Sequence, residues 1–152
     1  MSTFYSETSL TEDQVINIIR EEAESQFPKD CIVCGGGAIV NDSTVAGLIG
    51  MAHGTLYAAA KNAVMGLIKA ARREFAKQGV RINAVCPGVN RTDMYDRFSG
   101  GDKGMIEYVE NMHPMGRTGR PEEVAFAVYS LCKGATWTTG HGLAIDGGLT
   151  VS

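Results

Sequence analysis

The stretch TLYAAAKNAVMGLIKAARREFAKQGVRINAVCPG, residues 55–88, contains the pattern that decides the fold. Its first part predicts an amphipathic helix over residues 55–78, because apolar side chains recur there at helical spacing. These side chains are Ala60, Val64, Leu67, Ile68, Ala71 and Phe75. Gly79 is expected to end the helix as its left-handed cap. Residues 80–85 then predict a strand, which we expect to stop before Pro87 and Gly88 because proline does not continue a central strand.

The residues before this stretch predict a preceding strand and a loop. The short apolar run at residues 38–41, AIVN, is typical of a strand that is buried on both faces. Residues 43–54 are rich in glycine and hydroxyl residues, which predicts a loop. A strand, a helix and a second strand in this order predict a right-handed parallel unit.

The rest of the chain predicts further helices and one more strand. Residues 93–115 carry short helical pieces separated by glycines, which is typical of a mobile lid. Pro121 is expected to begin a helix that runs to about Lys133, and residues 143–145 predict the last strand. Residues 11–27 predict a helix at the N-terminal end.

Composition indicates one ordinary soluble domain. The 152 residues are 44% apolar with a net charge of −3, and no apolar run approaches the roughly 18 residues that cross a bilayer. The mild acidity argues against a nucleic-acid partner, and the N-terminus lacks the features of a secretion signal, so we expect a cytoplasmic protein. We expect four free cysteines, Cys31, Cys34, Cys86 and Cys132. No metal site is expected, because the three histidines are scattered over loop or lid segments, at His53, His113 and His141.

Two side chains at the start of the long helix could carry chemistry. Tyr57 and Lys61 are four residues apart, so they share one helical face. An ammonium near a phenol stabilises the phenolate and suits it to acid–base work. Thr44 precedes Tyr57 by 13 residues, and its hydroxyl could bond a carbonyl or alkoxide oxygen. Taken alone, such a pair is also common on helix surfaces.

Several further stretches accompany this pair, and together they resemble the short-chain dehydrogenase/reductase family. The resemblance covers about residues 36–149. Its stretches are GGAIVN (36–41), VAG (45–47), YAAAK (57–61), VRINAVCPG (80–88) with Thr92, GR (116–117), RPEEV (120–124) and IDGG (145–148). It implies an α/β fold, namely the C-terminal strands and helices of a Rossmann-like, doubly wound parallel sheet.

The resemblance also implies hydride transfer between NAD or NADP and a secondary alcohol or ketone. Tyr57 would protonate the carbonyl oxygen during reduction, and Lys61 would stabilise its phenolate while holding the nicotinamide ribose. Thr44 would stand where the family usually has a catalytic serine; it keeps the hydroxyl but adds a methyl group that restricts its rotamers. The remaining cofactor contacts would come from Pro87, Gly88, Asn90 and Thr92.

The first 34 residues differ from the family, because they contain no glycine and so no glycine-rich phosphate loop. The chain therefore reads as a single partial domain over 1–152, with a divergent helical segment at 1–34 and the catalytic portion at 35–152. The resemblance implies a catalytic asparagine on the helix before the first strand. Asn17 is the only asparagine on that helix, whereas the best local register places Ile19 at the expected position. The strand at 38–41 would be left as an unpaired apolar edge.

Two functions remain open at this point. The chain is either an oxidoreductase of the short-chain type that acts on a small-molecule alcohol or ketone, or a catalytically inactive, truncated paralogue that serves as an oligomerisation or partner-binding module. In both readings we expect a homo-oligomer or pairing with a full-length paralogue.

Overall fold

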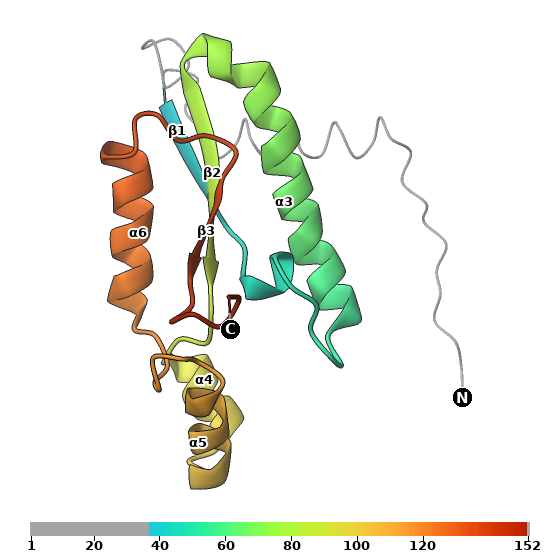
Figure 1. Ribbon diagram of the computed structural model, residues 1–152, viewed down its shortest axis with the longest axis vertical. Coiled ribbons are helices and arrows are strands. Elements are labelled where there is room, and N and C mark those ends of the chain that lie inside the picture. Colours follow the sequence, from blue (N-terminus) through green and yellow to red (C-terminus); the bar gives the residue numbers. More distant parts are fainter. Residues whose placement is uncertain (1–36, 152) are drawn as a thin grey trace, which may run out of the picture. The chain divides into compact units, whose positions relative to one another are not determined.

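The computed structural model describes residues 37–151, which form a parallel sheet with helices on both faces. Outside the described residues lie the predicted helix over 11–27, with Asn17 and Ile19, and the two cysteines Cys31 and Cys34. The sheet has the order β1-β2-β3, and both of its pairings are parallel (Figure 1). Its strands are β1 (Gly37–Asp42), β2 (Val80–Pro87) and β3 (Gly142–Ile145). The predicted strands and their parallel arrangement are therefore confirmed.

The helices follow the sequence pattern closely. The loop after β1 contains a short 3-10 turn, η1 (Val45–Gly47). The helices proper are α3 (Thr55–Phe75), α4 (Asp93–Ser99), α5 (Lys103–Asn111) and α6 (Pro121–Lys133). The last turn of the predicted long helix is a 3-10 turn, η2 (Ala76–Gln78), and Gly79 after it has φ 80°, the left-handed conformation that glycine adopts without strain.

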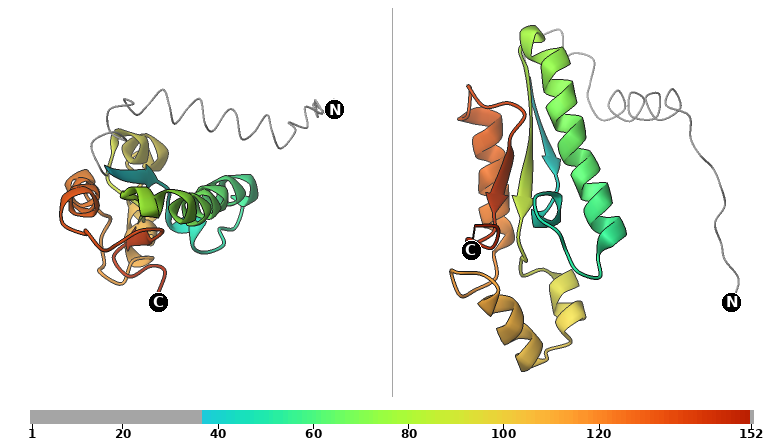
Figure 2. Two further views of the ribbon diagram at one scale, coloured as in Figure 1. Left: turned by 90° about the horizontal axis from the view of Figure 1, so that it is seen from above. Right: turned by 45° about the vertical axis from the view of Figure 1, so that its right-hand side comes forward.

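The central strand β2 divides its side chains between two apolar cores. Successive side chains of a strand point to opposite faces of the sheet. The even-numbered ones pack with α3, in a core of Met65, Ile68, Val80, Ile82, Ala84 and Cys86. Val85 points the other way and packs with Ala127 and Leu131 of α6. The view from above in Figure 2 shows α3 and α6 on opposite sides of the sheet.

The prediction that β2 ends before Pro87 is wrong by two residues. Pro87 is the last residue of the strand and is paired with Ile145 of β3. The ladder tolerates proline here because the next donor is the N–H of Gly88, which bonds the Ile145 carbonyl at 3.1 Å. The pairing of β2 with β3 therefore does not need an N–H on residue 87, and proline fits there.

The apolar face predicted for α3 is only partly right. Ile68 is fully buried, but Met65, which the pattern did not select, is buried beside it. Ala60 and Phe75 are exposed, the latter by 37%. The middle of the predicted stripe is confirmed, because Leu67 and Ala71 also pack against the core that contains Ile68. The stripe is wrong at its two ends and in leaving out Met65.

The predicted open edge is found at β1. Within residues 37–151, β1 pairs with β2 on one side and with no strand on the other. Helix α6 packs against the same strand through Val40, so the face of β1 is covered while its edge carries unpaired backbone groups in the part of the chain that the structure describes.

Arg81 fastens the end of α6 to β2. Its guanidinium donates to the carbonyls of Leu131, Cys132 and Ala135 at 2.6, 2.8 and 3.0 Å. The last carbonyls of a helix lack partners within the helix and carry partial negative charge, so a cation there both neutralises and satisfies them. The register between α6 and the sheet is thereby fixed.

Two smaller expectations concern the cysteines and the membrane. Cys86 and Cys132 are free thiols, as predicted. None of the described helices is both long and apolar enough to cross a membrane.

Candidate active site

Tyr57 and Lys61 lie on the first turns of α3, beside the carboxyl ends of the strands (Figure 1). The Lys61 Nζ is 5.9 Å from the centroid of the Tyr57 ring and donates a hydrogen bond to the Asp42 carbonyl at 3.3 Å. Asp42 is the last residue of β1, so the strand end orients the ammonium. Tyr57 is 47% exposed, which leaves its ring open to a bound molecule.

Two hydrogen bonds hold the loop that carries Thr44 against α3. The buried Ser43 hydroxyl donates to the Lys61 carbonyl at 3.3 Å, and the Asn62 side chain donates to the Ala46 carbonyl at 2.9 Å. Thr44 lies between these two anchors, and its hydroxyl donates to the Pro87 carbonyl at 3.2 Å. The structure thus joins three of the predicted site segments, namely the loop, the start of α3 and the end of β2.

The turn after β2 is tightly enclosed, which explains its glycine. A Cβ on Gly88 would lie 3.0 Å from the Asp146 Cα and 3.0 Å from the His113 Nε2. Any larger side chain would push apart the ends of β2 and β3. The carboxylate of Asp146 is itself fixed, because it accepts hydrogen bonds from the Gly148 N–H and from both the N–H and the hydroxyl of Thr150.

Asn90 and Thr92, the remaining predicted cofactor contacts, bond mainly to their own neighbourhood. The Asn90 side-chain amide donates to the Gly88 carbonyl at 3.0 Å, and its Oδ1 is buried without a hydrogen-bond partner. This oxygen is closed to solvent and lies against Gly119, at which a Cβ would collide with it. Thr92 is the N-cap of α4, with its hydroxyl accepting the Tyr95 N–H at 3.4 Å.

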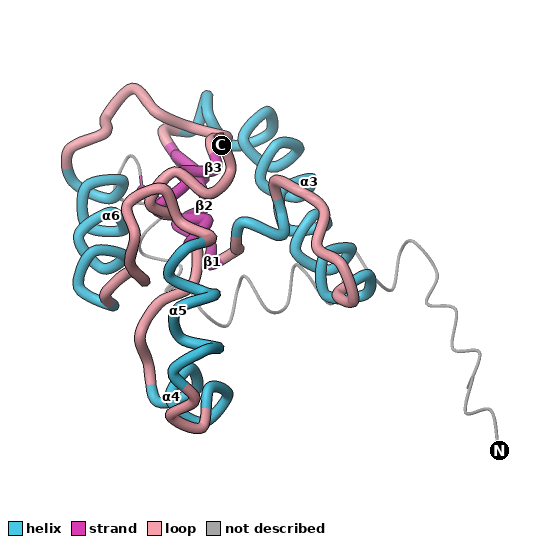
Figure 3. Tube along the Cα trace, turned by 60° about the horizontal axis from the view of Figure 1, so that its bottom comes forward, coloured by secondary structure: helices cyan, strands magenta, loops and turns pink. Residues whose placement is uncertain are grey.

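The segment predicted as a lid forms two short helices beyond the strand ends. Figure 3 shows α4 and α5 together on the side of the molecule where β1, β2 and β3 end. Several large apolar side chains of this segment are exposed, namely Met94, Phe98, Met105, Tyr108, Met112 and Met115. They offer an exposed apolar surface beyond the ends of the strands.

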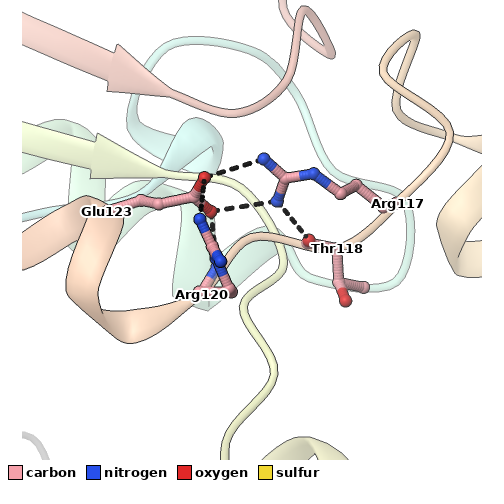
Figure 4. A network of polar contacts seen from close by, with 4 residues as sticks. All are labelled: Arg117, Thr118, Arg120 and Glu123. Atoms are coloured by element: carbon pink, nitrogen blue, oxygen red, sulfur yellow. Dashed lines mark hydrogen bonds and ion pairs between the residues drawn. The ribbon is translucent and has the colours of Figure 1, made fainter.

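A dense ion-pair network fixes the loop between the lid and α6 (Figure 4). The Arg117 guanidinium donates to both oxygens of Glu123 at 2.7 and 3.0 Å, and to the Thr118 carbonyl at 3.0 Å. Glu123 also accepts the Arg120 N–H at 2.8 Å, at the beginning of α6. The hydrogen bonds from Arg117, and then from the Arg120 backbone, lower the pKa of Glu123 from 4.5 to about 2.

Sequence reasoning missed two residues of this region. It placed His113 among loop or lid residues, but the side chain is buried, with only 2% exposed. It also passed over Asn62, whose amide ties the loop of Thr44 to α3. Neither residue belongs to a spaced motif, so only their three-dimensional contacts single them out. Within residues 37–151, no three His, Cys, Asp or Glu side chains are grouped as a metal ion would require.

Comparison with known proteins identifies the family. A family model described as enoyl-(acyl carrier protein) reductase matches residues 22–150, a range that includes the whole region of sequence resemblance. The chain belongs to the short-chain dehydrogenase/reductase family. Its parallel sheet with helices on both faces is accordingly the Rossmann-like fold of this family.

Two curated relatives in the short-chain dehydrogenase/reductase family are dehydrogenases of ring alcohols by name. A 2,5-dichloro-2,5-cyclohexadiene-1,4-diol dehydrogenase of Sphingobium indicum is 43% identical over 115 residues, which are 75% of this chain and 46% of that protein. A cyclohexanol dehydrogenase of an Acinetobacter species is 43% identical over 120 residues, which are 78% of this chain and 45% of that protein.

A solved member of the short-chain dehydrogenase/reductase family extends the match to three dimensions. The structure of ElxO with NADP bound superimposes with a TM-score of 0.79 at 32% sequence identity, and the match covers 95% of this chain and 61% of that one. The chain spans about half the length of the curated relatives it matches.

Proposed function

We propose that the protein is an oxidoreductase that interconverts a secondary alcohol and a ketone with NADP or NAD. The observation that carries the proposal is the placement of three side chains in a chain of the short-chain dehydrogenase/reductase family: Lys61, beside the Tyr57 ring, bonds the end of β1, and Thr44 bonds the end of the adjacent strand β2. Relatives named as alcohol dehydrogenases, and a solved relative with NADP bound, support the same chemistry.

The residues present fit a nicotinamide cofactor at the turn after β2. Tyr57 and Lys61 offer an exposed phenol and an ammonium, the kinds of donor that ribose hydroxyls accept from. The nicotinamide half of the cofactor would be held by Tyr57 and Lys61, by the turn of Pro87 and Gly88, and by Thr92. When bound, the cofactor supplies or accepts the hydride.

The chain's own residues would handle the proton and the substrate oxygen. Tyr57 Oη would give its proton to the oxygen as a ketone is reduced and take it back as an alcohol is oxidised. The Lys61 ammonium, held by the Asp42 carbonyl, would stabilise the phenolate left on Tyr57. Thr44 would donate to the substrate oxygen after turning its hydroxyl away from the Pro87 carbonyl, which it now bonds.

The exposed apolar side chains of α4 and α5 favour a substrate with a hydrophobic body. They would cover a ring or chain next to Tyr57 and exclude water from the reacting oxygen. Cyclohexanol and cyclohexanone are therefore suitable first probes, together with acyclic secondary alcohols of similar size.

A titration of the purified chain with NADPH and with NADH tests this proposal. We expect a saturable change in cofactor fluorescence, followed by turnover of at least one alcohol or ketone of the probe set. A chain that binds neither cofactor at millimolar concentration would contradict catalysis by this chain alone.

The open edge of β1 favours a second candidate, a non-catalytic partner-binding module. An unpaired apolar strand can accept a parallel strand of another protein, such as a longer relative of the same family. Mixing the chain with a full-length paralogue and weighing the products by native mass spectrometry tests this. Along β1 the N–H groups of Gly37 and every second residue after it face β2, so the N–H of Ala38 faces the open edge. We expect a mixed complex that the substitution Ala38→Pro abolishes, and only separate species if the candidate is wrong.

A further inference from the structure

The ring of His113 bonds a different segment of the chain with each of its nitrogens. Its Nδ1 lies 2.9 Å from the Val109 carbonyl, and its Nε2 lies 3.3 Å from the Val89 N–H. A carbonyl only accepts and an N–H only donates, so the ring must be neutral, with its proton on Nδ1. Both nitrogens are then satisfied, as a side chain with 2% exposure requires.

These two bonds connect the lid to the turn of the candidate site. Val109 is on the last turns of α5, and Val89 directly follows the Pro87 and Gly88 turn. The ring also lies against Gly88, because a Cβ there would be 3.0 Å from Nε2. The His113 carbonyl accepts the Gly116 N–H at 2.7 Å, a local bond that fixes the backbone of the residue carrying the ring.

A space-filling role alone would not require this bonding. An apolar side chain of similar size would fill the same space, but it would leave the N–H of the half-buried Val89 without its acceptor and free the end of α5 from the turn. The imidazole instead holds the Gly88–Val89 peptide and the last turns of α5 at a fixed separation.

We propose that His113 is a positioning residue that fastens the α4 and α5 lid to the turn after β2. Its effect on the cofactor rests on the proposed function, because it assumes that this turn contacts the nicotinamide. The bond from the Val89 N–H fixes the turn against the ring. The bond to the Val109 carbonyl fixes α5 against the same ring, so the turn and the lid keep one relative position.

Two substitutions separate the two bonds. In His113→Gln the side-chain oxygen can reach the position of Nε2 and accept the Val89 N–H. In His113→Asn the side-chain amide can reach the position of Nδ1 and donate to Val109, but nothing accepts from Val89. His141→Asn, at an exposed histidine, is the matched control.

Nuclear magnetic resonance of the cofactor-free protein gives the first readout. We expect the imidazole nitrogen spectrum to show a proton on Nδ1 and a bare Nε2. We expect the Val89 amide to exchange with solvent about tenfold faster in His113→Asn, and at nearly the wild-type rate in His113→Gln and His141→Asn. A proton on Nε2, or equal Val89 exchange in all variants, overturns the proposal. If His113→Asn does not fold, the tautomer in the wild-type spectrum and the Val89 exchange rate in His113→Gln decide whether the ring holds the turn.

Cofactor titration gives the second readout. The Kd for NADPH or NADH should rise about tenfold in His113→Asn and stay close to wild type in His113→Gln. Faster exchange with an unchanged Kd overturns the link to the cofactor. A wild-type chain that binds neither cofactor defeats the proposed function instead, and the exchange rates still decide whether His113 holds the turn.

Discussion

The Lys61 ammonium lies 5.9 Å from the centroid of the Tyr57 ring, one helical turn away along α3. A lysine on a helix surface normally samples many rotamers, which weakens any pairing with a neighbour. Here the Asp42 carbonyl accepts from its Nζ at 3.3 Å, so β1 restricts where the charge sits. The strand end therefore contributes to the arrangement of the pair, in addition to the spacing along the helix.

Replacing Tyr57 by phenylalanine should abolish turnover and leave cofactor binding nearly unchanged. The ring stays, but the hydroxyl that would exchange a proton with the substrate is lost, which typically costs a hundred- to ten-thousand-fold, roughly, in rate. Steady-state rates and cofactor titration measure the two effects. Tyr129→Phe, at an exposed tyrosine of α6, is the control and should be silent. Unchanged turnover in Tyr57→Phe would remove Tyr57 from the mechanism.

Replacing Lys61 by methionine should lower turnover and weaken cofactor binding together. The substitution keeps much of the side-chain volume but removes the charge and its bond to the Asp42 carbonyl. The exposed lysine of the same helix gives the matched control, Lys69→Met, for which we expect wild-type values. The same cofactor titration and rate measurements apply. Equal effects of the two substitutions would mean that only the general charge of α3 matters.

Alanine substitutions at two glycines should change stability in opposite directions. At Gly88 a Cβ meets the Asp146 Cα and His113, so we expect a loss of about 1–3 kcal/mol in the free energy of unfolding. At Gly66, an exposed position within α3 with open space around it, alanine should add up to about 1 kcal/mol. Urea unfolding of both variants measures this, and a stable Gly88→Ala would show that the turn is less confined than the structure indicates.

The Glu123 carboxylate should make stability sensitive to acid. Its pKa is lowered from 4.5 to about 2 by Arg117 and the Arg120 N–H, so its stabilising effect is complete above about pH 4.5 and is lost as the pH falls toward 2. Glu123→Gln should therefore melt earlier than wild type at pH 7, and the difference should shrink between pH 4.5 and 2. Melting temperatures across this range test it. Glu122→Gln, at the exposed neighbour, should follow the wild-type curve.

Most of the described fold could be predicted because it depends on local patterns. Apolar runs placed β1, β2 and β3, and helical spacing with Gly79 and Pro121 placed the ends of α3 and the start of α6. The errors came from neighbours that a local pattern does not contain. Met65 is buried because of where α3 meets β2, and Pro87 stays in the strand because Gly88 supplies the next donor.

In the candidate site, too, the residues set by local spacing could be predicted, and those set by distant contacts could not. The spacing of Tyr57 and Lys61 was enough to place them on one helical face, and the structure brings Thr44 to the Pro87 carbonyl. His113 could not be found in this way, because its partners are Val109, four residues earlier, and Val89, which is 24 residues away in the chain. Any residue except proline can donate its backbone N–H, so the sequence at residue 89 does not indicate that a histidine binds there.

The alternation of side chains along β2 has a consequence for how this protein can diverge. A single insertion in β2 would exchange the residues that face α3 with those that face α6, and both apolar layers would fail at once. The helices α4 and α5 contribute to neither apolar layer. The two glycines between them, Gly100 and Gly101, have open space around them but a left-handed backbone, with φ 56° and 77°, that favours glycine. New substrates are therefore more easily acquired by changing α4 and α5 around these glycines than by altering the sheet.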